Sequence, residues 1–164
     1  MKVYLIRHGI AVERGRSADD EQRPLTTKGK TKTARVARRL SSAGLKFTSI
    51  LTSPLVRAAQ TAEILQQAGL SQTIQTHDFL KPNGAIVAWL EWLQTEQLQH
   101  PQAQIALVGH QPDLGNWVEM LLWGTVKGQI IVKKAGVIGL KLPEIGTPLA
   151  RSTLFLHTAP KWLL

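Results

Sequence analysis

Two arginines and two histidines stand where a predicted strand gives way to a turn or a helix. Arg7 and His8 directly follow the first apolar run of the chain, and His110 follows a later one. Arg57 lies about one turn into a predicted helix. Guanidinium groups are permanently charged, planar donors that match phosphate oxygens, and a neutral histidine is a nucleophile and a base. These side chains suit phosphoryl transfer without a metal ion, in which catalysis is mainly positioning and charge stabilisation.

The strands that must position these side chains are short and almost wholly apolar. Residues 3–6 are a continuous apolar run and residues 104–108 a nearly continuous one, typical of strands buried on both faces of a parallel sheet. Residues 47–52 form another predicted strand, directly before the helix that carries Arg57. Ligands of open α/β sheets bind at the carboxyl ends of the strands. We therefore expect the three strand ends to converge on one anion site.

The predicted start of a helix fixes where Arg57 lies. Ser53 offers a capping hydroxyl, and Pro54 suits the first helical position. Arg57 would then lie near exposed backbone N–H groups and the positive end of the helix dipole, both of which favour an anion. The alternative is a surface arginine that pairs with an acidic residue of the preceding polar loop. The three possible partners are Glu13, Asp20 and Glu21.

The rest of the chain alternates between predicted helices and strands. Helices are expected from Thr26 or Thr27 to Gly44, from Ser53 to Gly69, over 85–98 and from Pro112, further strands over 75–80, 130–142 and 152–157, and a polar loop over 10–24. This alternation predicts a single α/β domain over residues 1–164, built as a three-layer α/β/α sandwich with a mostly parallel central sheet of about six strands.

Three motifs resemble those of the histidine phosphatase superfamily, the phosphoglycerate-mutase-like enzymes. They are RHG at 7–9, SPxxRAxQTA at 53–62 and GH at 109–110. The short chain, the RPLTxKG element at 23–29 and the LxPxG element at 80–84 resemble the bacterial, SixA-like phosphohistidine phosphatase branch. The resemblance implies a phosphoglycerate-mutase-like fold. It also implies that His8 attacks phosphorus and carries a transient phosphohistidine, while His110 steadies the transferring oxygens beside Arg7 and Arg57.

The general acid is less clearly marked. Many members of this superfamily carry a glutamate near the third strand end, and the SixA-like branch often has an acidic residue just before LxPxG, where this chain has Phe79. Asp78 and Asp20 are the two candidates here. A weak general acid matters most for alkyl phosphates and less for phosphohistidine, because imidazole titrates near pH 6.5. We therefore expect a preference for N–P bonds or activated esters over phosphoserine and sugar phosphates.

These features predict a metal-independent phosphatase without a cofactor, which acts through a phosphohistidine intermediate and releases inorganic phosphate. The expected substrate is phosphohistidine on a protein. A small-molecule phosphomonoesterase on the same fold and a non-catalytic phosphate-binding module are the alternatives. Zinc held by His8 and His110 is disfavoured, because two neighbouring arginines oppose a cation and no third ligand has suitable spacing.

The charge of the chain is strongly positive, with 20 Lys and Arg against 11 Asp and Glu and a formal net charge of +9. Seven of the cations fall within 23–39, on a basic helix that is either a solvated face or a surface steering an acidic phosphocarrier domain. Nucleic-acid binding is not expected, because no aromatic residue interleaves with these cations. The absence of cysteine and of a long apolar run favours a cytoplasmic protein without a membrane span.

Overall fold

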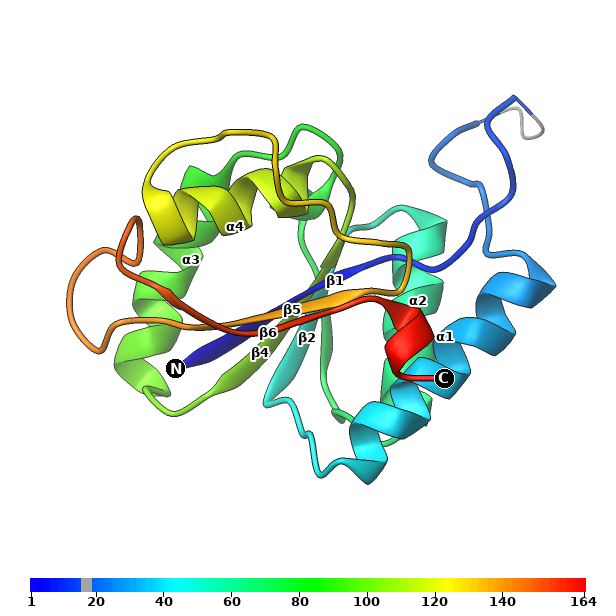
Figure 1. Ribbon diagram of the computed structural model, residues 1–164, viewed down its shortest axis with the longest axis horizontal. Coiled ribbons are helices and arrows are strands. Elements are labelled where there is room, and N and C mark those ends of the chain that lie inside the picture. Colours follow the sequence, from blue (N-terminus) through cyan, green and yellow to red (C-terminus); the bar gives the residue numbers. More distant parts are fainter. Residues whose placement is uncertain (16–18) are drawn as a thin grey trace.

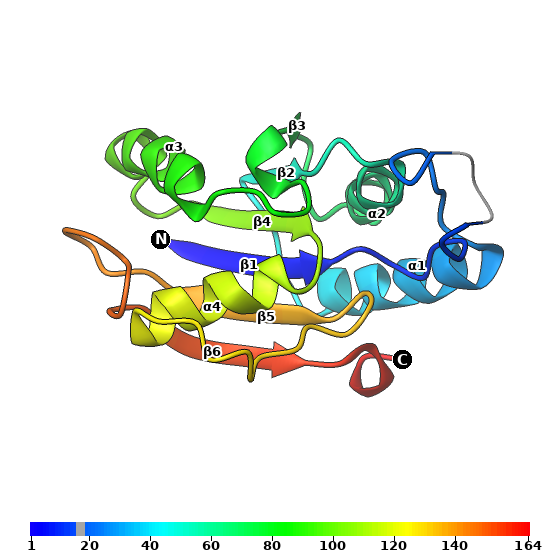
Figure 2. The same ribbon diagram turned by 90° about the horizontal axis from the view of Figure 1, so that it is seen from above.

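The first apolar run of the chain forms β1 (Lys2–Arg7), an inner strand of a six-stranded sheet (Figures 1 and 2). The computed structural model describes residues 1–15 and 19–164. The other strands are β2 (Ser49–Thr52), β3 (Ile74–Thr76), β4 (Gln104–Gly109), β5 (Val137–Lys141) and β6 (Thr153–Thr158). In the order β3-β2-β4-β1-β5-β6, the first four strands pair in parallel, whereas β5 pairs antiparallel with β1 and β6 antiparallel with β5. The predicted, mostly parallel sheet is confirmed.

Helices cover both faces of this sheet, which confirms the three-layer α/β/α architecture (Figure 1). The helices are α1 (Thr27–Ser42) and α2 (Val56–Gln67) on one face and α3 (Ile86–Gln99) and α4 (Asp113–Trp123) on the other, with single 3₁₀ turns at η1 (Asp78–Leu80) and η2 (Pro160–Trp162). Side chains of β1 alternate between the two layers. Val3 and Leu5 pack in the core beneath α3 and α4, whereas Tyr4 and Ile6 pack beneath α1 and α2.

The start of α1 follows the prediction, and the start of α2 does not. Thr26 caps α1, since its hydroxyl accepts a 2.9 Å hydrogen bond from the Gly29 N–H. Helix α2 begins at Val56, so Ser53 and Pro54 lie before it rather than at its cap and first turn. The Ser53 hydroxyl lies 2.9 Å from His110 Nε2 and also accepts a 3.3 Å hydrogen bond from the Leu55 N–H.

Two predicted strands lose more than half of their expected length. Residues 75–80 supply the last two residues of β3 and then η1, because the N–H groups of Leu80 and Lys81 bond locally to the carbonyls of His77 and Asp78. Of the range 130–142, only Val137–Lys141 is strand. The segment before it is a loop, because the buried Glu119 carboxylate of α4 accepts the N–H groups of residues 127–130.

Candidate active site

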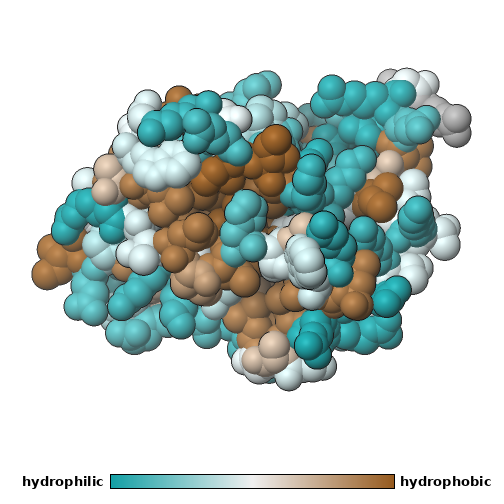
Figure 3. All heavy atoms as spheres, viewed as in Figure 1, coloured by the Kyte–Doolittle hydropathy of each residue, from teal (hydrophilic) through white to brown (hydrophobic). Residues whose placement is uncertain are grey.

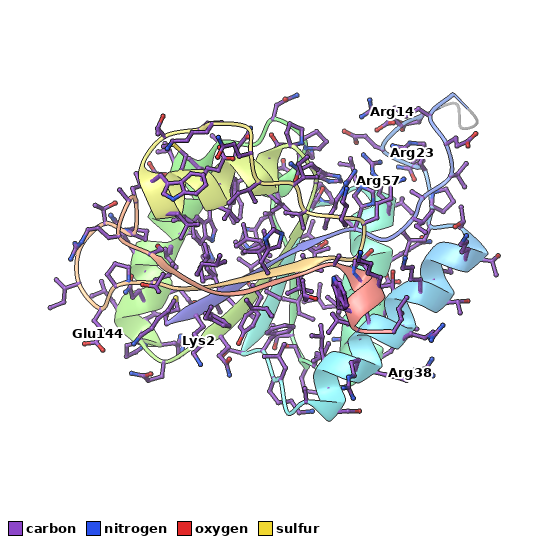
Figure 4. The ribbon with its side chains drawn as sticks, viewed as in Figure 1. Lys2, Arg14, Arg23, Arg38, Arg57 and Glu144 are labelled. Atoms are coloured by element: carbon purple, nitrogen blue, oxygen red, sulfur yellow. The ribbon has the colours of Figure 1, made fainter. Side chains whose placement is uncertain are left out.

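The four predicted side chains lie together in a cavity of about 550 Å³ at the carboxyl ends of the parallel strands. Arg7, His8, Arg57 and His110 all line it. Arg7 ends β1 and pairs in register with Gly109, which ends β4, so the residues that follow both strands emerge side by side. The convergence predicted from the strand ends is therefore confirmed. Figure 4 shows Arg57 and Arg23 beside the loop that follows β1.

The backbone around Gly9 holds the ring of His8 in place. His8 Nδ1 lies 2.7 Å from the Gly9 carbonyl oxygen, and the Gly9 N–H donates to Thr61 Oγ1 at 3.0 Å. A carbonyl only accepts hydrogen bonds, so Nδ1 carries the proton and Nε2 keeps its lone pair. Glycine is favoured at position 9, because a Cβ there would lie 2.4 Å from Thr33 Oγ1 and would force that side chain to move.

The surroundings of His8 keep its ring neutral. Burial is the main cause and lowers the pKa of His8 from 6.5 to about 3. His110 and the two arginines act in the same direction, while the hydrogen bond to Gly9 opposes the shift. At neutral pH this histidine therefore has the protonation state that a nucleophile requires.

His110 approaches His8 from β4, and the two ring centroids are 5.2 Å apart. Burial, followed by the Arg57 charge, lowers the pKa of His110 to about 3. Its Nε2 contacts Ser53 Oγ, which holds the ring orientation from the end of β2. Ser53 is completely buried. Its role was missed from sequence, where its place before Pro54 indicated a helix cap.

Arg57 is almost fully buried, with 2% of its surface exposed, yet it also pairs with Asp20. One terminal nitrogen donates to the Asp20 carbonyl at 2.7 Å, and the other lies 3.2 Å from Asp20 Oδ2. Arg23 Nε donates to Asp20 Oδ1 at 2.8 Å. These contacts hold the polar loop after β1 against α2. The alternative of a surface arginine that pairs with Asp20 is therefore right about the partner and wrong about the exposure of Arg57.

Arg7 is held from the opposite side by the loop before β5. Its NH1 donates to the Val132 carbonyl at 3.0 Å. Gln111 braces the same loop, since its side chain donates to the Ile130 carbonyl and accepts from the Val132 N–H. The Glu119 carboxylate anchors the start of the loop. These supports are distant in sequence from Arg7, and no motif marked them.

Neither of the two acidic residues predicted as general acids lines the cavity. Asp78 lies on η1, largely exposed and 3.2 Å from Lys81 Nζ, and it does not line the cavity. The hydrogen bond from Arg23, together with the nearby arginine charges, lowers the pKa of Asp20, which disfavours it as a proton donor. Asp113, in the first turn of α4, lines the cavity and accepts the Asn83 N–H at 3.2 Å. Its place three residues after His110 was the signal that sequence analysis overlooked.

Three residues that line the cavity each have one buried side-chain nitrogen without a hydrogen-bond partner within residues 1–15 and 19–164. These nitrogens are Arg7 Nε, Arg57 Nε and His110 Nδ1. Unpaired buried polar atoms are costly, and these three belong to residues that converge on one cavity. An oxyanion such as phosphate would offer acceptors to fixed cations of this kind.

Comparisons with known proteins identify the family of this chain. The family model of the histidine phosphatase superfamily (branch 1) matches residues 3–82. An uncharacterized protein of Picosynechococcus sp. is 48% identical over all of this chain and 99% of its own length. Phosphohistidine phosphatase SixA of Escherichia coli is 30% identical over 76% of either chain. The chain therefore belongs to the histidine phosphatase superfamily.

Solved structures place the chain within that superfamily. A structure of the protein histidine phosphatase SixA complexed with tungstate has a TM-score of 0.87 and 25% identity, and the match covers both chains completely. Phosphoserine phosphatase of Entamoeba histolytica shares the fold, with a TM-score of 0.73 and 18% identity over 99% of each chain. The chain is SixA-like, and the superfamily supports hydrolysis of phosphate esters, with a phosphorylated substrate and phosphate as product.

Within residues 1–15 and 19–164, none of the helices is long and apolar enough to cross a bilayer.

Proposed function

We propose that this protein removes the phosphoryl group from phosphohistidine on another protein, with His8 as the nucleophile. The observation that carries the proposal is the His8–Gly9 hydrogen bond, which leaves Nε2 of a buried neutral ring unprotonated in a cavity lined by Arg7 and Arg57. Similarity to SixA proteins supports the phosphohistidine substrate.

The reaction has two steps. His8 Nε2 attacks phosphorus, the P–N bond of the substrate breaks, and the departing imidazole gains a proton from water. Water then attacks the phosphohistidine on His8, which returns the ring to its neutral state and releases inorganic phosphate. Arg7 and Arg57 bind the equatorial oxygens throughout, and His110, whose ring the Ser53 hydroxyl orients, steadies them from the cavity wall.

A small phosphate ester is the second candidate substrate. The observation that favours it is Asp113, a carboxyl at the cavity wall that could protonate an alkoxide leaving group. A phosphoserine phosphatase also shares this fold.

The test is time-resolved phosphate release from a phosphohistidine peptide and a matched phosphoserine peptide, with EDTA throughout. Wild type should turn over the phosphohistidine peptide at least about a hundredfold faster in kcat/KM, because imidazole leaves phosphorus without a general acid, whereas an alkoxide depends on one even where the enzyme offers a carboxyl. His8→Ala should have no activity and should still bind tungstate, a tetrahedral oxyanion. Equal rates on both peptides would assign the site to phosphate esters, and full activity of His8→Ala would refute the nucleophile.

A further inference from the structure

A second, more open groove of about 500 Å³ adjoins the catalytic cavity. Arg7 and Lys134 line both, so the two adjoin at the loop before β5. The groove lies where α1, this loop and η2 meet. Figure 3 shows the face of the molecule that carries β6 and η2, where apolar surface runs between polar side chains.

The rim of the groove is cationic and has no counter-charge. Lys32 of α1, Lys133 and Lys134 of the loop, and Lys161 of η2 surround it, and no acidic residue lines it within the described ranges. None of the four lysines forms an ion pair with any residue of 1–15 or 19–164. Clustered like charges repel one another, so an anionic partner would gain from binding here.

The floor of the groove is apolar. It is formed by Ile10, Ala159 and Pro160. Arginine forks bind phosphate with fixed geometry, whereas lysines on flexible stems act as point charges. Among the described residues that line the groove, the one arginine is Arg7, which also lines the catalytic cavity, so the groove itself offers lysines rather than a second set of planar donors. An apolar floor with a lysine rim matches a protein segment that presents one apolar side chain among carboxylates.

We propose that this lysine groove, formed by Lys32, Lys133, Lys134 and Lys161 around Ile10, Ala159 and Pro160, docks an acidic segment of the phosphorylated partner protein. The inference rests on the proposed function and deepens it, because it names the chemistry that the partner carries beside its phosphohistidine. The basic helix at 23–39, expected from sequence to steer an acidic partner, contributes only part of this surface. Its Lys32 lines the groove, whereas two other cations of the helix, Arg35 and Arg39, do not.

The test uses two synthetic peptides with one phosphohistidine each. One has Asp and Glu around the phosphohistidine together with one Leu, and the other has Asn and Gln in place of the acids. The groove variant is Lys32→Glu, Lys133→Glu, Lys161→Glu, which spares Arg7 and Lys134. The control variant, with the same change of charge elsewhere, is Lys30→Glu, Arg38→Glu, Lys141→Glu; none of these three residues lines either cavity.

Wild type should favour the acidic peptide by at least about tenfold in kcat/KM at low salt, and the preference should shrink as salt screens the charges. The groove variant should lose this preference and the control variant should keep most of it. Both variants should hydrolyse para-nitrophenyl phosphate, which reaches only the cavity, at wild-type rates. If both variants lost the preference for the acidic peptide equally, only the net charge of the protein would matter, and the proposal would be overturned.

A binding measurement separates this inference from the proposed function. Anisotropy of a fluorescein-labelled acidic peptide without phosphohistidine should show binding that the groove variant loses. If wild type binds this peptide but hydrolyses no phosphohistidine, the groove stands and the proposed substrate fails. Absence of binding to the peptide would overturn the groove. Tighter binding of an oligothymidine strand, lost in the groove variant, would overturn it in favour of nucleic acid.

Discussion

Nδ1 of His8 lies 2.7 Å from the carbonyl oxygen of Gly9, the next residue in the chain. The first prediction follows from this contact and from the burial that lowers the pKa of His8 to about 3. Nitrogen-15 NMR should find His8 as the neutral, Nδ1-protonated tautomer from pH 8 down to about pH 5. The same protein unfolded in urea provides the reference titration. An imidazolium signal for His8 that appears near pH 6.5 in the folded protein would contradict the assignment.

The second prediction concerns stability in acid. The pKa values of His8 and His110 are about 3 in the folded protein, against 6.5 for a free side chain. Between these values the unfolded chain binds protons that the folded protein excludes, so the free energy of unfolding falls as pH is lowered from about 6.5 toward 3. Each histidine adds up to ~1.4 kcal/mol per pH unit to that slope.

His110→Asn tests this directly. Urea unfolding at pH 7, 5 and 4 should give a shallower loss of stability for the variant than for wild type, by the contribution of one proton. Groups that do not interact with His110 titrate alike in both proteins and cancel in the comparison, and the NMR titration of His8 in the variant corrects for the influence of His110 on its pKa. Parallel pH profiles for the two proteins would mean that His110 is protonated normally in the fold.

The third prediction addresses the Ser53 hydroxyl, which lies 2.9 Å from His110 Nε2. Ser53→Ala should lower kcat/KM about tenfold, the effect of one buried hydrogen bond that orients a ring in the cavity. Thr52 offers a matched control, because its buried hydroxyl bonds to the Ser53 carbonyl rather than to a histidine. If Thr52→Val lowers activity as much as Ser53→Ala, the effect is structural.

The fourth prediction concerns proton donation by Asp113. Asp113→Asn should lower kcat/KM for a phosphoserine peptide by about a hundredfold, because serine leaves as an alkoxide that needs a proton. Hydrolysis of para-nitrophenyl phosphate should change little, since nitrophenolate leaves without one. Asp78→Asn is the control at an acidic residue outside the cavity. Equal losses on the two substrates would exclude Asp113 as the proton donor.

The fifth prediction concerns Glu119, which anchors the loop whose Val132 carbonyl accepts a hydrogen bond from Arg7. The Glu119 side chain is buried, and its four backbone hydrogen bonds outweigh burial and hold the pKa of this carboxyl below its usual value. Glu119→Gln removes the charge and one acceptor oxygen, so the variant should unfold at a clearly lower urea concentration than wild type. The folded variant should also bind tungstate more weakly, because the loop that carries Val132 no longer holds Arg7 firmly.

Glu63→Gln on the exposed face of α2 is the control for the loss of one carboxylate. Its stability and tungstate affinity should equal those of wild type. Unchanged tungstate binding by folded Glu119→Gln would show that Arg7 does not depend on the loop.

Local patterns in the sequence were sufficient to predict the ends of β1 and β4, where the site residues lie. Continuous apolar runs indicated β1 and β4 because strands buried on both faces admit few polar residues, and Arg7, His8 and His110 follow them directly. The parallel arrangement then brings these ends to one edge of the sheet. That reasoning needed no knowledge of distant contacts, so it succeeded.

Tertiary structure decided the features that depend on partners far apart in the chain. Ser53 could cap a helix or orient His110, and burial beside β4 selected the second role. Residues 130–136 have strand-like composition, yet Glu119 takes the N–H groups at the start of the loop. Asp20 carries the same carboxyl group as Asp113, but Arg23 and Arg57 engage Asp20, whereas Asp113 faces the cavity. A local pattern specifies what a residue can do, and only its neighbours in space determine which hydrogen bonds it makes.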